Sequence, residues 1–183
     1  MTTPNSTMAK TRWNLDPSHS EVTFKVKHLM ITNVRGSVGK YDILCETDGD
    51  DFMTAKVSFT ADVASITTNQ PQRNAHLMSD DFFNVEKYPE IKFIATKYEK
   101  VDNDSYELYG DLTIRDITKP VKFDVEFAGI VVDAYGNTRA GFIVNGKINR
   151  KEYGLRWDAI TEAGNVVAAD EVRLHAEIQL IKS

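Results

Sequence analysis

Hydrophobic and polar residues alternate along most of the chain, and this period of two predicts β-strands rather than helices. The alternating segments cover residues 22–28, 34–43, 55–63, 91–95, 106–114, 121–127, 140–148 and 172–180. Turn residues separate several of them, including Asp102-Asn103-Asp104 and the loop at 133–137. Such a series of about eight antiparallel strands at hairpin spacing is typical of an all-β barrel or sandwich.

One long segment interrupts the strand pattern between residues 69 and 84. Pro71 suits the first turn of a helix, and we expect a short helix from there through Met78. A second short helix or turn is expected at 150–153, where we interpret Arg150 as a clamp on a neighbouring acid or carbonyl. The predicted fold is therefore an antiparallel eight-stranded β-barrel with one or two short helices.

The apolar stripe is nearly complete on every predicted strand, which indicates one enclosed apolar interior. A filled core and a lipid-binding cavity produce the same stripe, because both require hydrophobic side chains inside the barrel. The composition favours a filled core. Eight strands of this length, however, exceed what a minimal packed barrel needs, and lipocalin-type barrels use such a surplus to hold a ligand. The pattern alone leaves both interpretations open.

Length and charge narrow the class of protein. The chain has 183 residues, which suits one domain, and we assign residues 1–11 to a disordered tail and 12–183 to the barrel. A formal net charge of −5 argues against a nucleic-acid partner. The sequence contains no stretch long enough to span a membrane and no secretory leader. We therefore expect a cytoplasmic protein, or a periplasmic one if a leader has been removed.

Few residues suggest covalent or metal chemistry. Cys45 is the single cysteine, so no intramolecular disulfide can form, and the histidines at 19, 28, 76 and 175 lack metal-ligand spacing. There is no G-x-S-x-G nucleophile motif. We expect no metal, no cofactor and no catalytic residue. The alternative of another class is an enzyme that acts on a small amphiphile with His28 as general base.

Three polar residues are candidates for contact with the head group of a ligand. His28 lies on the apolar face of its strand, so it either meets a ligand or bonds a backbone carbonyl or a buried acid. Arg73 and His76 share one face of the predicted helix, and arginine suits bidentate contact with phosphate. The alternative for this pair is an ion pair with Asp80, Asp81 or another acid.

Several segments in order resemble the YceI family, whose members are lipocalin-like polyisoprenoid-binding proteins. They are WNLDPSHSEVTFKVKHLMITNVRG at 13–36, RNAHLMSDDFFNVEKYPEIKF at 73–93, GDLTIRDITKPVKF at 110–123, RAGFIVNGKINRKEYGLRW at 139–157 and the closing ADEVRLHAEIQL. The resemblance implies a β-barrel with an apolar tunnel, a covering helix and no known catalytic role. It also implies ligands with long isoprenoid chains, or fatty-acid-like amphiphiles. Many members carry a leader for the periplasm, and this chain departs from them there.

We accordingly expect apolar side chains to line a tunnel, with one of the adjacent Phe82 and Phe83 entering it and the other anchoring its segment. Trp157 either lines the tunnel or closes its end. The predicted lining residues are Phe24, Val26, Leu29, Ile31, Leu77, Phe82, Phe83, Phe93, Leu112, Ile114, Phe123, Phe142 and Trp157.

The expected function is to bind, sequester or transport a long-chain amphiphilic lipid, such as a prenylated quinone or a prenyl diphosphate. A fatty acid or fatty amide in the same cavity is one alternative, and a packed interaction module without a ligand is another. Release of the ligand would require the segment at 69–84 to move. A homodimer is also considered, because barrels offer exposed edges and loops for pairing.

Overall fold

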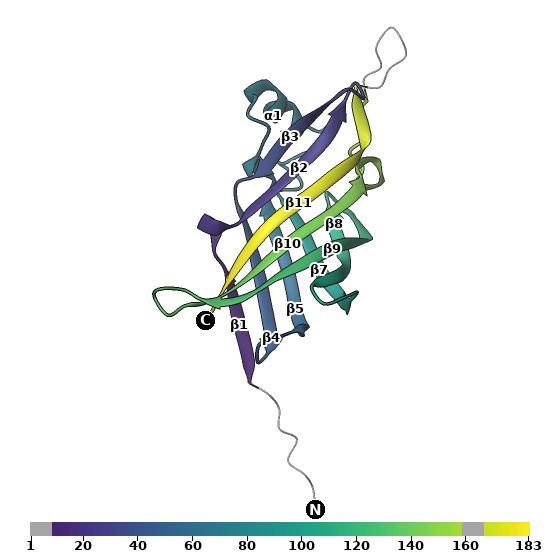
Figure 1. The fold of residues 1–183 in the computed structure, drawn as a ribbon. Coiled ribbons are helices and arrows are strands. Elements are labelled where there is room, and N and C mark those ends of the chain that lie inside the picture. Colours follow the sequence, from purple (N-terminus) through teal and green to yellow (C-terminus); the bar gives the residue numbers. More distant parts are fainter. Residues whose placement is uncertain (1–8, 159–166) are drawn as a thin grey trace, which may run out of the picture.

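The computed structural model describes residues 9–158 and 167–183, and its strands form one antiparallel sheet that closes on itself. Closure comes from β1 (Lys10–Leu15), which pairs with β4 on one side and β11 on the other. The remaining barrel strands are β4 (Tyr41–Asp48), β5 (Asp51–Asp62), β7 (Glu90–Lys100), β8 (Ser105–Ile114), β9 (Ile117–Val132), β10 (Thr138–Asn149) and β11 (Ala168–Lys182) (Figure 1). The predicted eight-stranded antiparallel barrel is confirmed.

Three further strands extend the sheet from β11: β2 (Glu21–His28), β3 (Thr32–Val38) and the short β6 (Ile66–Thr67). β1 and β2 share β11 as a neighbour, since Leu15 pairs with Leu180 and Val26 pairs with Val172. The 3-10 turn η1 (Pro17–His19) separates them. The long strand β11 thus pairs with both β1 and β2, and each of these two forms part of the wall at one end of the barrel.

Two sequence-based boundaries differ from the structure. The alternating segment at 34–43 is two strands, because the chain turns at Gly39 and Lys40, after which β4 pairs with β1 and β5 while β3 pairs with β2 and β6. The predicted tail at 1–11 falls partly on residues 1–8, which lie outside the described residues. Lys10 and Thr11, however, belong to β1 and pair with Asp48 and Thr47.

Short helical segments flank the barrel. α1 (Pro71–Met78) is confirmed, with Pro71 in its first turn and the Gln70 side chain accepting hydrogen bonds from the first free backbone amides. It covers one end of the barrel (Figure 1). The expected second turn is η3 (Arg150–Tyr153), and a third, η2 (Val63–Ser65), precedes β6. Among the described residues, no helix combines the length and apolar character needed to cross a membrane.

The buried side chains fall into two groups. One surrounds Trp13 and Phe52 at the β1 end of the barrel, and the Trp13 indole donates a hydrogen bond to Thr47 Oγ1 at 2.9 Å. The other lies toward the α1 end around Phe93, Leu112 and Tyr153. The β1 end is therefore packed like an ordinary core, and the space between the two groups is the place for a cavity.

Candidate ligand-binding cavity

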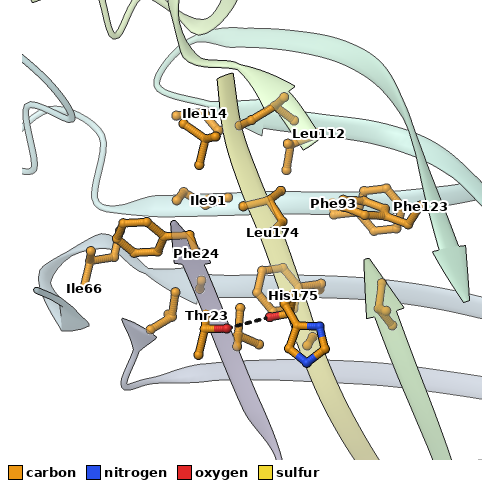
Figure 2. A pocket seen from close by; sticks show the side chains of 18 of the residues that line it. Thr23, Phe24, Ile66, Ile91, Phe93, Leu112, Ile114, Phe123, Leu174 and His175 are labelled. Carbon is orange, nitrogen blue, oxygen red and sulfur yellow. Dashed lines mark hydrogen bonds between the residues drawn. The ribbon is translucent and has the colours of Figure 1, made fainter. Parts of the chain in front are cut away.

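A cavity of about 550 Å³ lies inside the barrel. This volume falls in the range of small-molecule sites, roughly 300–1,000 Å³. Figure 2 shows apolar side chains from well-separated strands around one space, among them Phe24 of β2, Ile91 of β7, Leu112 of β8 and Leu174 of β11. Cys45, Phe52, Ile178 and Leu180 of the group at the β1 end also line this space, so the packed residues there form one wall of the cavity.

Three phenylalanines in the cavity wall lie over glycines of neighbouring strands. A Cβ atom built on each glycine would clash with the nearest ring carbon, at 2.2 Å for Gly36 and Phe24, 2.5 Å for Gly110 and Phe93, and 2.4 Å for Gly146 and Phe123. Glycine in a strand often marks such a close approach. Because the rings take the space that a side chain would fill at the wall, they extend less far into the middle of the barrel.

His28, Arg73 and His76, the three predicted head-group candidates, all line the cavity. His28 is the last residue of β2. Arg73 donates from Nε to Thr68 Oγ1 at 2.8 Å and from Nη2 to the Thr68 carbonyl at 3.0 Å. The His76 Nε2 atom lies 2.8 Å from Asp81 Oδ2, so the predicted ion-pair alternative is found for His76, whereas Arg73 binds a hydroxyl and a carbonyl instead.

An aromatic cluster borders the cavity at the α1 end. The His76 ring packs edge-on against Phe82, with centroids 5.0 Å apart, and against Trp157 at 4.9 Å. Trp157 borders the cavity within this cluster, and its ring also lies 5.5 Å from that of Phe82. Phe82 and Phe83 both border the cavity, and both pack against the buried group around Phe93.

The chain that leads to Trp157 is held by Arg150, as the sequence predicted. This guanidinium is only 4% exposed and donates from Nη1 to the carbonyls of Leu155 and Trp157, at 2.6 and 2.9 Å. It also lies 3.2 Å from Asp158 Oδ1. Because a buried charge needs such partners, Arg150 fixes the path of this segment and with it one side of the cavity.

Two predicted lining residues lie elsewhere. Leu29 and Ile31 belong to the turn between β2 and β3 and do not line the cavity; Ile31 is 80% exposed. The physical reason is the hairpin itself, because the Ile31 amide donates to the His28 carbonyl at 3.1 Å and the chain reverses just after His28. The alternation that places His28 inward therefore stops there.

The sequence list also missed some residues that line the cavity, including Cys45, Val57, Tyr98 and Leu174. Val57 and Leu174 stand on the apolar face of recognised strands, so the alternation itself was the signal. Cys45 is 4% exposed, and burial raises the pKa of its thiol to about 12. Burial likewise raises the pKa of the Tyr98 phenol. Neither group is ionised in the neutral range, so both present polar but uncharged atoms.

The hydrogen-bond partners of the histidines bear on the alternative of acid–base chemistry. Within residues 9–158 and 167–183, no carboxylate is hydrogen-bonded to the His28 ring, and no cluster of three metal-ligand side chains occurs. His19 and Ser18 both contact Asp16, but the Ser18 hydroxyl lies 3.2 Å from the same Nδ1 atom that faces Asp16. A nucleophile triad needs the serine at the other ring nitrogen. His175 bonds Asn145 on the outer face.

The fold and the cavity define a lipocalin-like β-barrel with an internal apolar cavity and polar groups near one end. The chain belongs to the YceI family, since the sequence pattern of the YceI-like domain matches residues 13–180. A UPF0312 protein of Staphylococcus aureus (strain USA300) is 35% identical over 170 residues, which cover 92% of this chain and 96% of that protein.

Solved structures share the fold. The YCEI protein of Campylobacter jejuni is 34% identical, with a TM-score of 0.74, over 92% of this chain and 96% of that one. BcnA of Burkholderia cenocepacia has a TM-score of 0.78 at 21% identity, over 90% and 98% of the two chains. A polyisoprenoid binding domain from Saccharophagus degradans has a TM-score of 0.63 at 13% identity, over 93% and 98%. The last two likenesses concern the fold alone.

Proposed function

We infer that this protein binds one long-chain amphiphilic lipid inside the barrel, with a polyisoprenoid such as a prenylated quinone or prenyl diphosphate as the ligand class. The observation that carries this proposal is the cavity of about 550 Å³, which is lined almost entirely by apolar side chains. Three polar side chains, His28, Arg73 and His76, line the cavity and would contact the head group of the lipid. We propose a binding protein rather than an enzyme.

The driving force would be removal of hydrocarbon from water. Each buried methylene contributes about 0.8 kcal/mol before the cost of ordering the ligand is subtracted. Apolar contacts discriminate poorly between chains of similar width, so the cavity would accept related lipids, and the polar groups would set their orientation. Two kinds of relative support an isoprenoid: the family to which the chain belongs, and the structural neighbour from Saccharophagus degradans that is described as a polyisoprenoid binding domain.

Native mass spectrometry of the purified protein, followed by organic extraction and lipid analysis, tests the proposal directly. An adduct of one lipid per chain with the mass of an isoprenoid compound is the expected result. A fatty-acyl adduct would retain the cavity but replace the ligand class. Bare protein that also refuses added geranylgeraniol, solanesol and palmitic acid would overturn the proposal.

A pair of variants separates binding inside the barrel from adhesion to its surface. Val57→Phe places a larger side chain in the cavity, whereas Ser58→Phe adds the same ring to the outward position next to it in β5. Titration of the Trp157 fluorescence with geranylgeraniol is the measurement, with Trp13→Phe as the background so that only the cavity tryptophan reports. We expect Val57→Phe to weaken binding roughly tenfold and Ser58→Phe to leave it unchanged.

A further inference from the structure

The turn between β2 and β3 exposes apolar side chains at the tip of a hairpin. Met30 is 58% exposed and Ile31 is 80% exposed. The tip lies at the same end of the barrel as α1, at the point where β2 and β3 meet (Figure 1). Val131 and Val132 near the β9–β10 turn are exposed to a similar degree, so exposure alone does not assign a role to the tip.

The backbone of this turn makes its composition more unusual. Leu29 has φ of 51° and Met30 has φ of 61°, the left-handed region in which glycine and asparagine are favoured. A tight hairpin with two such residues normally carries Asn-Gly or Asp-Gly. Leu29 and Met30 therefore strain the backbone, and such a departure from local rules in a folded protein points to function.

The strands that carry the tip are basic. β2 and β3 carry Lys25, Lys27 and Arg35 against one acid, Glu21, which is the first residue of β2 and the farthest from the tip, although the whole chain has a net charge of −5. Lys25 pairs directly with Arg35 in β3 and with Arg173 in β11, so three cations stand side by side across three strands. Like charges directly opposite one another are unfavourable in a sheet unless an anion offsets them. Glu171 Oε1 lies 3.3 Å from Arg173 Nε and offsets that cation, whereas no ion pair within the described residues involves Lys25 or Arg35.

The hairpin tip also adjoins the cavity. His28, the last residue before the turn, lines the cavity, and the backbone amide of Leu29 donates to the carbonyl of Val167, another lining residue, at 2.9 Å. An object that contacts the tip therefore stands next to the wall formed by His28 and Val167.

We propose that the β2–β3 hairpin docks the protein on an anionic lipid bilayer, with Met30 and Ile31 inserted among the acyl chains and Lys25, Lys27 and Arg35 facing the head groups. Apolar side chains beside a basic face are the combination that binds such a surface. The inference deepens the proposed function, on which it rests: the bilayer would be the source or the destination of the lipid in the cavity.

Flotation with vesicles tests the docking. The full chain is mixed with vesicles of phosphatidylcholine and phosphatidylglycerol in equal parts, and separately with vesicles of phosphatidylcholine alone. We expect binding to the anionic vesicles at least tenfold stronger than to the neutral ones, and its loss in about 0.5 M salt. Equal binding to anionic and neutral vesicles would overturn the proposal. Absence of binding to either kind would overturn it too, and would leave an acidic protein as the partner of the basic face.

Variants assign the binding to the tip. Leu29→Asn combined with Met30→Gly installs the residues that the turn favours, so the fold should gain stability while vesicle binding falls roughly tenfold. Ile31→Ser is a second test that leaves packing intact, because that side chain is exposed. The matched control is Val131→Ser with Val132→Ser on the distant β9–β10 hairpin, where the residues are 62% and 69% exposed. Unchanged binding in both tip variants, or an equal loss in the control, would refute the assignment.

Loading of the cavity is measured separately, with geranylgeraniol supplied in detergent rather than in vesicles. Tip variants that load normally in detergent but no longer bind vesicles support both the docking surface and the cavity. A wild-type chain that loads in detergent and ignores anionic vesicles overturns the docking alone. A chain that binds vesicles through its tip and never loads overturns the proposed function, and with it the role assigned to the bilayer as a lipid source.

Discussion

The phenyl ring of Phe24 occupies the space directly over Gly36, its pairing partner in β3, where a Cβ atom would fall 2.2 Å from Cζ. The same relation recurs at two other places in the barrel wall. Cavity size thus depends on glycines that keep aromatic rings at the wall. A residue with any side chain at position 36 has to displace the Phe24 ring, and the cavity lies on its other side.

Gly36→Ala is therefore expected to destabilise the fold by about 1–3 kcal/mol and to weaken lipid binding, because the Phe24 ring is driven into the cavity. Urea unfolding gives the stability, and titration with geranylgeraniol gives the affinity. Gly141→Ala is the matched control, since its added methyl would meet Ala128 Cβ at an ordinary 3.5 Å. If the two variants behave alike, the glycine at position 36 does not set the position of the ring.

A second prediction concerns acid pH. The Asp16 side chain, which is 8% exposed, accepts hydrogen bonds from Ser18 Oγ at 2.7 Å and from Arg139 Nη1 at 2.6 Å, and His19 Nδ1 lies 2.7 Å away. These contacts hold the pKa of Asp16 well below its usual range, although burial opposes them. A carboxylate with a lowered folded pKa stabilises the fold above its unfolded pKa of about 3.9, and that contribution disappears as the pH falls below it.

The free energy of unfolding should therefore fall as the pH is lowered from about 5 to about 2. Asp16→Asn should cost about 2 kcal/mol at neutral pH and flatten this dependence, because the ionisable partner is gone. Glu177→Gln, at an exposed position of β11, should leave the slope unchanged. Urea unfolding across the pH range is the measurement, and an equally steep slope in Asp16→Asn would contradict the assignment.

The alternation of residues predicted the barrel and most of the cavity wall because side-chain direction in a strand follows from position alone. His28 is an example: it lies two residues after Val26, so it was predicted to face inward, and it lines the cavity. Ile31 illustrates the limit. Leu29 and Met30 adopt a turn conformation that usually requires glycine or asparagine. Their residue types therefore did not predict that the chain turns after His28.

The alternation of hydrophobic and polar residues could not predict contacts between strands, for a different reason. The pairs Gly36–Phe24 and Asp16–Arg139 depend on the register of strands, and the second pair is 123 residues apart. The turn between β2 and β3 fixes the register of the first pair, whereas the second pair joins the N-cap of η1 to β10 across the closed barrel. The sequence therefore predicted which residues face inward, and the closed barrel determines which of them meet.

A third prediction concerns the mobility of α1. None of its residues is buried, although His76 and Leu77 line the cavity, and a helix of eight residues is marginal without tertiary support. We expect amides of 71–78 to exchange hydrogen faster than those of β10 and β11, and to slow when lipid is bound. Hydrogen–deuterium exchange with and without geranylgeraniol is the measurement. Protection equal to that of the strands would count against α1 as the moving cover of the cavity.

The last prediction uses Cys45 as a reporter of the cavity. It is the single cysteine, it lines the cavity, and burial raises the pKa of its thiol to about 12. At a given pH it therefore carries roughly a thousandfold less thiolate than an ordinary cysteine, and the thiolate is the reactive form. Labelling of the native chain with a maleimide near pH 8 should be correspondingly slow, and a bound lipid should slow it further by occupying the adjacent space. Mass spectrometry follows the reaction, with Ser58→Cys in a Cys45→Ser background as the outward-facing control. Fast labelling of Cys45 that lipid does not affect would place the thiol outside the space that the ligand fills.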